Sequence, residues 1–117
     1  MKLTIVQDDP QGVRVAISGK VTQHDFSATQ EPLADMLGRG VYGRQISLDL
    51  AETMYVDSAG VGWLLTCHKR TREAGGKLKL ENTPSIVANL LRLLKLSKLL
   101  GIDPPGEEQS PEAGGLA

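Results

Sequence analysis

Four short segments of the chain predict β-strands, three because apolar positions alternate with other residues and one because it is rich in residues that favour strands. The first two segments are residues 3–7 and 13–17, and the turn-forming residues 8–12 between them predict a hairpin. The third is residues 45–50, with an apolar side chain at every second position, and the fourth is residues 77–81, which alternate strictly. The pattern therefore predicts a sheet that opens with an antiparallel pair of strands.

Helical spacing of apolar residues follows the second, third and fourth strands. The first helix is predicted to begin at Pro32, because proline suits the first turn of a helix, and to end near Gly38 or Gly40. A second helix is predicted to start at Ser58, after a connecting loop over residues 51–57. Gly75 and Gly76 should end this second helix, because glycine is the preferred residue just after a helix. Its apolar face is predicted to consist of Val61, Leu64, Leu65 and His68.

The last main helix is predicted to follow the Thr83–Pro84 pair, with Thr83 as its N-cap and Pro84 as its first helical residue. A short further helical turn is expected over residues 96–102. The buried face of the main helix is predicted to consist of Val87, Leu90, Leu91 and Leu94.

Strands that alternate with helices predict an α/β fold with right-handed crossovers. The chain has 117 residues, which suits one domain with one core. We expect that domain to span residues 1–102 and to contain a mixed sheet of four to five strands. Residues 103–117 are rich in acids, proline and glycine and are expected to form a flexible tail.

Composition narrows the class of protein. Aromatic residues make up only 3% of the chain, so the core is predicted to be aliphatic. No apolar run is long enough to span a bilayer, and the first residues become acidic too early for a signal peptide. A single cysteine, Cys67, cannot form an internal disulfide, which favours a cytoplasmic protein. The net charge of −1 gives no indication of direct nucleic-acid binding.

The segment with the most chemical information is residues 57–62, Asp-Ser-Ala-Gly-Val-Gly, between a predicted strand and a predicted helix. The free N–H groups and the dipole at a helix N-terminus both favour an anion. A phosphate on Ser58 would add about −1.5 to −2 charge there without breaking the helix. Gly60 and Gly62 would leave the first turn bare for close approach of a partner. The alternative is structural: Ser58 is an ordinary N-cap, and the two glycines only relieve crowding.

These residues resemble the signature of STAS domains, found in anti-sigma factor antagonists and in the tails of sulfate transporters. The similarity runs over most of residues 3–102, and the Asp-Ser-Ala-Gly element is its most specific part. Further matching positions are Gly19, Leu48-Asp49-Leu50, Leu64-Leu65, Gly75-Gly76-Lys77-Leu78, Leu93-Leu94-Lys95-Leu96 and Leu99-Leu100-Gly101-Ile102. The resemblance implies a single STAS-like domain with helices packed mainly on one face of the sheet.

The resemblance also implies a function. In the family, a kinase-type anti-sigma factor phosphorylates the matching serine, a PP2C-type phosphatase removes the phosphate, and the unphosphorylated form binds the anti-sigma factor. Ser58 is then expected to be the phosphate acceptor, with Asp57, Ala59 and Gly60 shaping the docking surface. The chain is thus expected to be a phospho-switch in transcription regulation, a monomer or weak dimer, not an enzyme, and without a cofactor.

One position departs from the family pattern. Antagonists commonly carry an acid soon after the second strand, in a Gly-x-x-Asp arrangement, and here Thr22 stands at that place with Asp25 nearby. Both residues are taken as part of the docking surface. The departure motivates a second hypothesis, in which the domain is a scaffold or accessory subunit that does not switch, as in stressosome-type assemblies or a lipid-transport ATPase.

Three remaining residues suggest other roles. A helical projection places Trp63 opposite the apolar stripe of its helix, which would make it an exposed interface anchor; the alternative is that a neighbouring segment covers it. A serine hydrolase is disfavoured, because Val56 replaces the first glycine of Gly-x-Ser-x-Gly, and His68 lies ~15 Å from Ser58 along the helix. His24 has no visible orienting partner, and one cysteine with two histidines lacks the spacing of a metal site.

Overall fold

A four-stranded mixed sheet forms the centre of the molecule in the computed structural model, which describes residues 1–26, 32–96 and 98–100. Strand β1 (Lys2–Asp9) pairs antiparallel with β2 (Gly12–Val21), which gives the predicted hairpin. Strands β3 (Gln45–Val56) and β4 (Lys77–Glu81) follow in parallel, so the strand order equals the sequence order. The predicted α/β class and the mixed sheet are confirmed.

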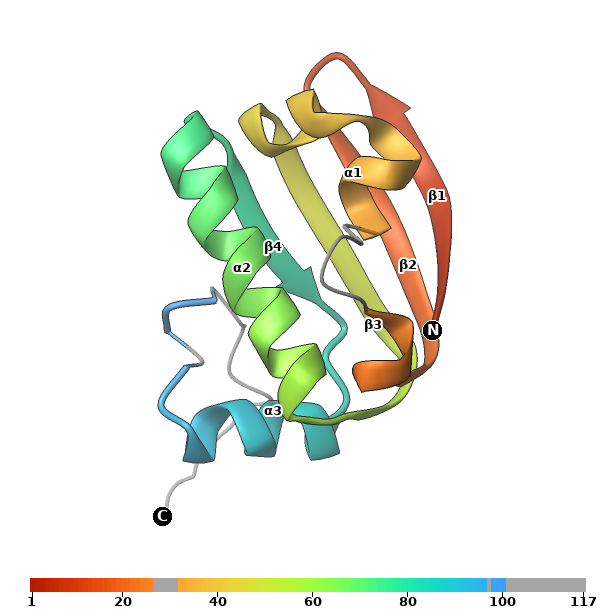
Figure 1. The fold of residues 1–117 in the computed structure, drawn as a ribbon, viewed down its shortest axis with the longest axis vertical. Coiled ribbons are helices and arrows are strands. Elements are labelled where there is room, and N and C mark those ends of the chain that lie inside the picture. The colour runs from red at the N-terminus through yellow and green to blue at the C-terminus, as the bar shows by residue number, and fades with distance from the viewer. Residues whose placement is uncertain (27–31, 97, 101–117) are drawn as a thin grey trace.

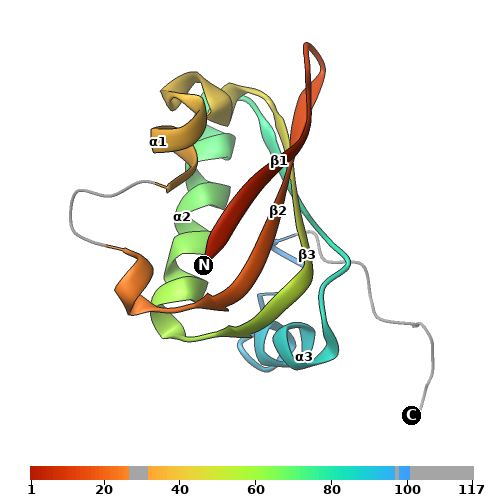
Figure 2. The same cartoon turned by 90° about the vertical axis from the view of Figure 1, so that its right-hand side faces the viewer.

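Helices α1 and α2 cover one face of this sheet, as predicted (Figures 1 and 2). Helix α3 lies at the end of the sheet where β3 stops and α2 starts, and it contacts β3. The helical elements are η1 (Gln23–Asp25), α1 (Pro32–Leu37), η2 (Arg39–Gly43), α2 (Ser58–Ala74) and α3 (Ser85–Leu93). Helix α2 ends as predicted, because Gly75 adopts a left-handed conformation with a φ of 84°.

The core lies between the sheet and these helices, and it is largely aliphatic, as the composition predicted. Alternate residues of each central strand face it, because successive side chains of a strand point to opposite sides. The fully buried large side chains are Val15, Ile17, Leu33, Val41, Ile46, Leu48, Leu50, Leu64, Leu80, Val87, Leu91 and Leu100.

The opposite face of the sheet is polar, and a network of charged side chains joins its central strands. Arg14 contacts Asp49 at 3.3 Å and Glu81 at 2.6 Å, so it joins β2 to β3 and β4. Asn82 donates a further hydrogen bond to Asp49 at 3.2 Å.

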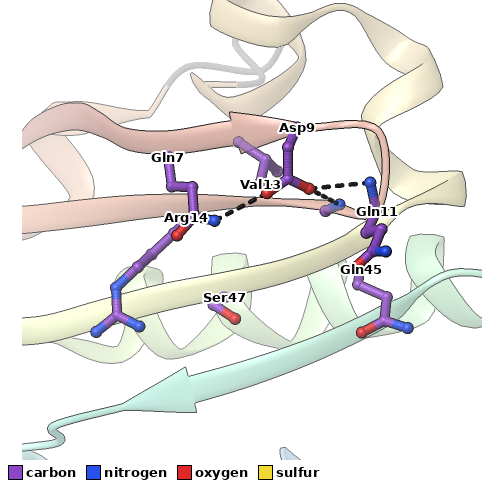
Figure 3. A pocket seen from close by; sticks show the side chains of 8 residues that line it. Gln7, Asp9, Gln11, Val13, Arg14, Gln45 and Ser47 are labelled. Carbon is purple, nitrogen blue, oxygen red and sulfur yellow. Dashed lines mark hydrogen bonds between the residues drawn. The ribbon is translucent and has the colours of Figure 1, made fainter.

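A hollow of about 170 Å³ lies on the polar face at the hairpin end of β1 and β2 (Figure 3). Its groups bond locally: Gln7 donates to one oxygen of Asp9 at 2.8 Å, and Gln11 N–H donates to the other at 2.9 Å. The hydrogen bond from Gln7, followed by those from the Gln11 and Gly12 backbones, lowers the pKa of Asp9. These bonds close the hairpin turn, and that turn lies at the other end of the sheet from the start of α2 (Figure 1).

Strand β3 is longer than predicted, and the predicted loop over residues 51–57 is wrong for all but Asp57. Two register shifts explain the difference, because each leaves β3 with one more residue than β2 over the same stretch. The buried positions of β3 are therefore spaced by two and then by three, at Ile46, Leu48, Leu50, Thr53 and Val56. Because this spacing is not a strict alternation, the sequence pattern did not predict the second half of β3.

The last helix also differs in detail from its prediction. Pro84, not Thr83, is the N-cap of α3, and the helix ends at Leu93. Val87 and Leu91 are buried as predicted and Leu90 is half-buried, whereas Leu94 is exposed. Beyond α3, a single turn is closed by the Leu100 N–H, which donates to the Leu96 carbonyl at 3.0 Å. The predicted tail, residues 103–117, lies outside the described residues.

Replacing Thr53 with Val tests the bulged half of β3. The buried Thr53 hydroxyl donates to the Ile17 carbonyl at 3.0 Å, and valine keeps the shape but removes this hydrogen bond. We expect the free energy of unfolding to fall by about 1 kcal/mol in urea titrations. The matched control Thr4→Val, on the exposed part of β1, should stay within about 0.5 kcal/mol of wild type. Equal effects from the two variants would contradict this role of Thr53.

Candidate functional site

The candidate site is the N-terminus of α2, which packs directly on the ends of β2 and β3. The backbone N–H of Asp57 donates to the Val21 carbonyl at 3.1 Å, which continues the strand pairing to the start of the helix. The Val61 N–H then donates to the Asp57 carbonyl at 2.9 Å and closes the first helical turn. Two adjacent parallel strands therefore fix where the helix begins.

Gly60 makes this close packing possible. A Cβ atom at position 60 would lie 2.6 Å from a methyl carbon of Val56 and 2.7 Å from the Val21 carbonyl oxygen. Gly60 is buried accordingly, so the prediction that it leaves the outer surface bare for a partner is wrong. Gly62 is the glycine that meets this description, because it is exposed and a Cβ there would have no neighbour within 4 Å.

Asp57, not Ser58, is the N-cap of α2, which corrects the sequence-based assignment. One carboxylate oxygen of Asp57 accepts from the Gly60 N–H at 3.0 Å, and the other accepts from the Gln23 N–H at 3.0 Å. Hydrogen bonding from Gly60 lowers the pKa of Asp57 most strongly; bonds from Gln23 and Ala59 add to it, while burial and the Asp25 charge oppose it. The carboxylate thus joins α2 to η1, whose first residue is Gln23.

Ser58 occupies the first position of α2 and is exposed. Its hydroxyl has no hydrogen-bond partner among the residues that the structure describes. The N–H groups of the first helical turn have no partner within the helix, so the surroundings of the hydroxyl favour negative charge. The neighbouring Ala59 is half-buried. Ser58 is therefore accessible, and its side chain does not support the fold.

Thr22 and Asp25 border Gln23, whose backbone N–H reaches the Asp57 carboxylate, and Asp25 has a structural role. Its carboxylate accepts from the Thr22 N–H at 2.8 Å and forms an ion pair with the amino group of Met1 at 2.9 Å. Burial acts to raise the pKa of Asp25, but the bonds from Thr22 and the amino group outweigh it and lower the pKa. The acid near the expected position is thus used to hold η1 together.

Trp63 is buried, with 6% of its surface exposed, so the prediction that it faces outward is wrong. Phe26, which follows η1, covers it; the two ring centroids are 5.5 Å apart and the rings are tilted by 31°. A helical projection treats the helix in isolation and cannot include a covering segment from elsewhere in the chain. Trp63 holds the segment after β2 against α2, which is the alternative that the sequence left open.

The backbone N–H of Gln23 and the ring of Phe26 are two parts of the site that sequence reasoning missed. A backbone donor gives no signal in the sequence, since any residue at position 23 would supply it. Phe26 is the only phenylalanine in a chain poor in aromatic residues, and this rarity was the one available indication that it packs against Trp63.

The described residues do not form a catalytic triad around Ser58 or a metal site. His68 lies in α2, ten residues after Ser58, and His24 lies exposed in η1; no hydrogen bond joins either to Ser58 in the described ranges. No cluster of three or more metal-ligating side chains occurs among the residues described. None of the described helices combines the length and the apolar character required to cross a bilayer.

Together, the one-sided α/β fold and the accessible serine at a helix start define a small STAS-type domain. A family model described as "Mlab, STAS domain" matches residues 5–101, which is most of the chain. The chain therefore belongs to the STAS-domain family.

Similar proteins agree with this assignment. The anti-sigma-B factor antagonist of Bacillus subtilis (strain 168) is 24% identical over 102 residues, covering 87% of this chain and 91% of that protein. The unphosphorylated form of the anti-sigma factor antagonist SpoIIAA has a TM-score of 0.61 at 14% identity, covering 91% of both chains. A Thermotoga maritima protein described as a candidate anti-sigma factor antagonist has a TM-score of 0.72 at 20% identity, covering 91% of this chain and 88% of its own. At these identities the two structures establish the fold.

Alanine at positions 60 and 62 provides a matched test of the helix start. Gly60→Ala forces a methyl group against the Val56 side chain and the Val21 carbonyl oxygen. We therefore expect the free energy of unfolding to fall by about 1–3 kcal/mol. Gly62→Ala meets open space and removes a flexible residue from a helix, so we expect a gain of about 0.5–1 kcal/mol. Urea unfolding of both variants measures these changes. A tolerated Gly60→Ala would contradict the close packing.

Replacing Asp57 with Asn keeps a capping side chain but removes its charge. The pKa of Asp57 is lowered in the folded state, so the charged form stabilises folding above the unfolded pKa of about 4, and this stabilisation is lost as the pH falls below that value. We expect wild type to be more stable than Asp57→Asn at neutral pH and the difference to shrink toward about pH 3. Urea unfolding at several pH values measures it. A difference that does not depend on pH would argue against a charged cap.

Proposed function

We propose that this chain is a cytoplasmic anti-sigma factor antagonist that is switched by phosphorylation of Ser58. In the proposal, the unphosphorylated protein binds a kinase-type anti-sigma factor and so releases a sigma factor. The anti-sigma factor phosphorylates Ser58, and a PP2C-type phosphatase restores the binding form. The names of the similar proteins support the antagonist part, and the geometry of Ser58 supports the switch.

The observation that carries the proposal is the separation of two roles at the helix start. Asp57 caps α2 through its bond to Gly60 N–H, while the exposed Ser58 hydroxyl has no hydrogen-bond partner among the described residues. A kinase can therefore modify Ser58 without removing the cap on which the fold depends.

A phosphate on Ser58 changes the surface because of the charges already present. It adds about −1.5 to −2 charge next to the Asp57 carboxylate, in a region that also contains Asp25. A partner that packs closely on Ser58 would have to remove water from this charge, and burying an unpaired charge can cost several kcal/mol. Phosphorylation thus favours release of the partner while the domain itself stays folded.

A second candidate function is a scaffold or accessory subunit that docks through the same surface without switching. The carboxylate of Asp25 favours it, because its two oxygens bond to Thr22 N–H and to the amino group of Met1 and do not form a free acidic surface. The description of the matching family model, which names Mlab, also keeps this candidate open. In this case Ser58 would contribute shape only.

Phosphate transfer to Ser58 distinguishes the two candidates. We expect the cognate anti-sigma factor and ATP to label wild type at one site, mapped by mass spectrometry to Ser58. Ser58→Ala should remain unlabelled and should still bind the anti-sigma factor, whereas Ser58→Asp should lose at least about tenfold in affinity. Calorimetry of the three proteins with the anti-sigma factor measures the binding.

Thr66→Ala is a suitable control for this experiment, because Thr66 is a hydroxyl residue of the same helix whose side chain already donates to the Gly62 carbonyl at 2.9 Å. Its labelling and binding should equal those of wild type. Labelling that persists in Ser58→Ala would refute the switch. Full binding by Ser58→Asp, without any labelling of wild type, would favour the accessory subunit.

A further inference from the structure

Helix α3 has apolar side chains over more of its circumference than the core uses. The core covers Val87, Ala88 and Leu91, which share one side of the helix. At about 100° per residue, Ile86, Leu90 and Leu93 fall together on the adjacent side, and we refer to these three as the α3 stripe. Ile86 is 62% and Leu93 is 81% exposed. The α3 stripe thus forms an apolar surface that the described part of the domain leaves uncovered.

The α3 stripe begins at the end of β3, which is close to Ser58 in the chain. Ile86 and Leu90 line an apolar notch of about 150 Å³ together with Tyr55 and Val56, the last two residues of β3. Tyr55 is itself 48% exposed, and Ser58 follows two residues after Val56. Helix α3 and the start of α2 lie at the same end of the sheet (Figures 1 and 2). A partner that covers Ser58 can therefore reach the notch and the stripe without crossing the domain.

The charged residues of α3 and of the segment that follows it are all positive. Arg92, Lys95 and Lys98 are exposed, and residues 82–100 contain no acid. Residues 82–100 therefore contribute a charge of +3 next to the exposed α3 stripe. A surface that complements it has apolar side chains with carboxylates at their border, since opposite charges across an interface favour association and like charges oppose it.

The need for apolar side chains bordered by carboxylates distinguishes between the molecules that could bind the α3 stripe. A second copy that used the same stripe would bring its own three cations against these three, which opposes a symmetric dimer. Residues 103–117 contain four acids but only one large apolar side chain, Leu116, so they match the charge and not the apolar surface. The same acids, close after Leu100 in the chain, would repel an anionic membrane. An acidic, apolar segment of another protein fits both properties.

We infer that the α3 stripe is a second docking site for the anti-sigma factor, which binds there through an apolar segment bordered by acidic residues. The inference rests on the proposed function and adds to it the chemistry of the partner's surface. Ser58 then controls one end of a longer interface, and the stripe supplies affinity that phosphorylation does not directly change.

Two pairs of substitutions test the site, with binding to the cognate anti-sigma factor measured by calorimetry. The double variant Ile86→Gln with Leu93→Gln removes the apolar surface from exposed positions, so the domain should fold normally, as circular dichroism would verify. The double variant Lys95→Glu with Lys98→Glu reverses two charges. We expect each pair to weaken binding by about tenfold or more, and the charge variant also to show a smaller dependence of affinity on salt.

Matched controls come from the far side of the molecule. Val6→Gln removes an apolar side chain that is 56% exposed on β1, and Lys77→Glu reverses an exposed charge at the start of β4. Both should bind within about twofold of wild type. The inference is overturned if the α3 variants also bind within about twofold while Ser58→Asp loses binding, and it is overturned together with the proposed function if wild type does not bind. If the α3 variants lose binding and Ser58→Asp does not, the docking site stands and the switch fails.

Discussion

The close approach of the first turn of α2 to the ends of β2 and β3 is the constraint on which the rest of the site depends. It requires a residue without a side chain at position 60, because Val21 and Val56 occupy the space where a Cβ would lie. It also brings the Asp57 carboxylate within reach of two backbone donors, Gly60 in its own helix and Gln23 in η1. The start of α2 is therefore fixed by the packing of Gly60 and by the charged Asp57 cap. The Ser58 side chain is not needed for either.

Two segments that are distant in sequence form one surface around this helix start. Phe26 packs on Trp63 and holds the residues after β2 in place, while the notch between Tyr55 and Ile86 connects the other side to α3. The first contact is internal and the second is open to solvent. The domain thus combines a rigid platform under the serine with an apolar, basic surface next to it, an arrangement suited to recognition of a protein surface.

Much of the fold could be predicted from the sequence, because most strands alternate regularly and α1 and α2 each end before a glycine. The site was predicted in position but not in detail. Asp57 and Ser58 are both good capping residues, and in the structure it is Asp57 whose carboxylate accepts from the Gly60 N–H. Its second oxygen accepts from the Gln23 N–H, a donor that the path of the chain after β2 brings there. Trp63 was misplaced for a similar reason, since Phe26 covers it from a segment that a single-helix projection does not contain.

The two bulges in β3 have a further consequence for how the chain can vary in length. Each adds a residue to β3 that has no counterpart in β2, so a strand shorter by one residue at either place would regain regular pairing. Such a deletion would still direct Thr53 and Val56 inward and would keep Asp57 at the end of the strand. The bulges are thus points where related chains can gain or lose a residue without displacing the serine from the start of its helix.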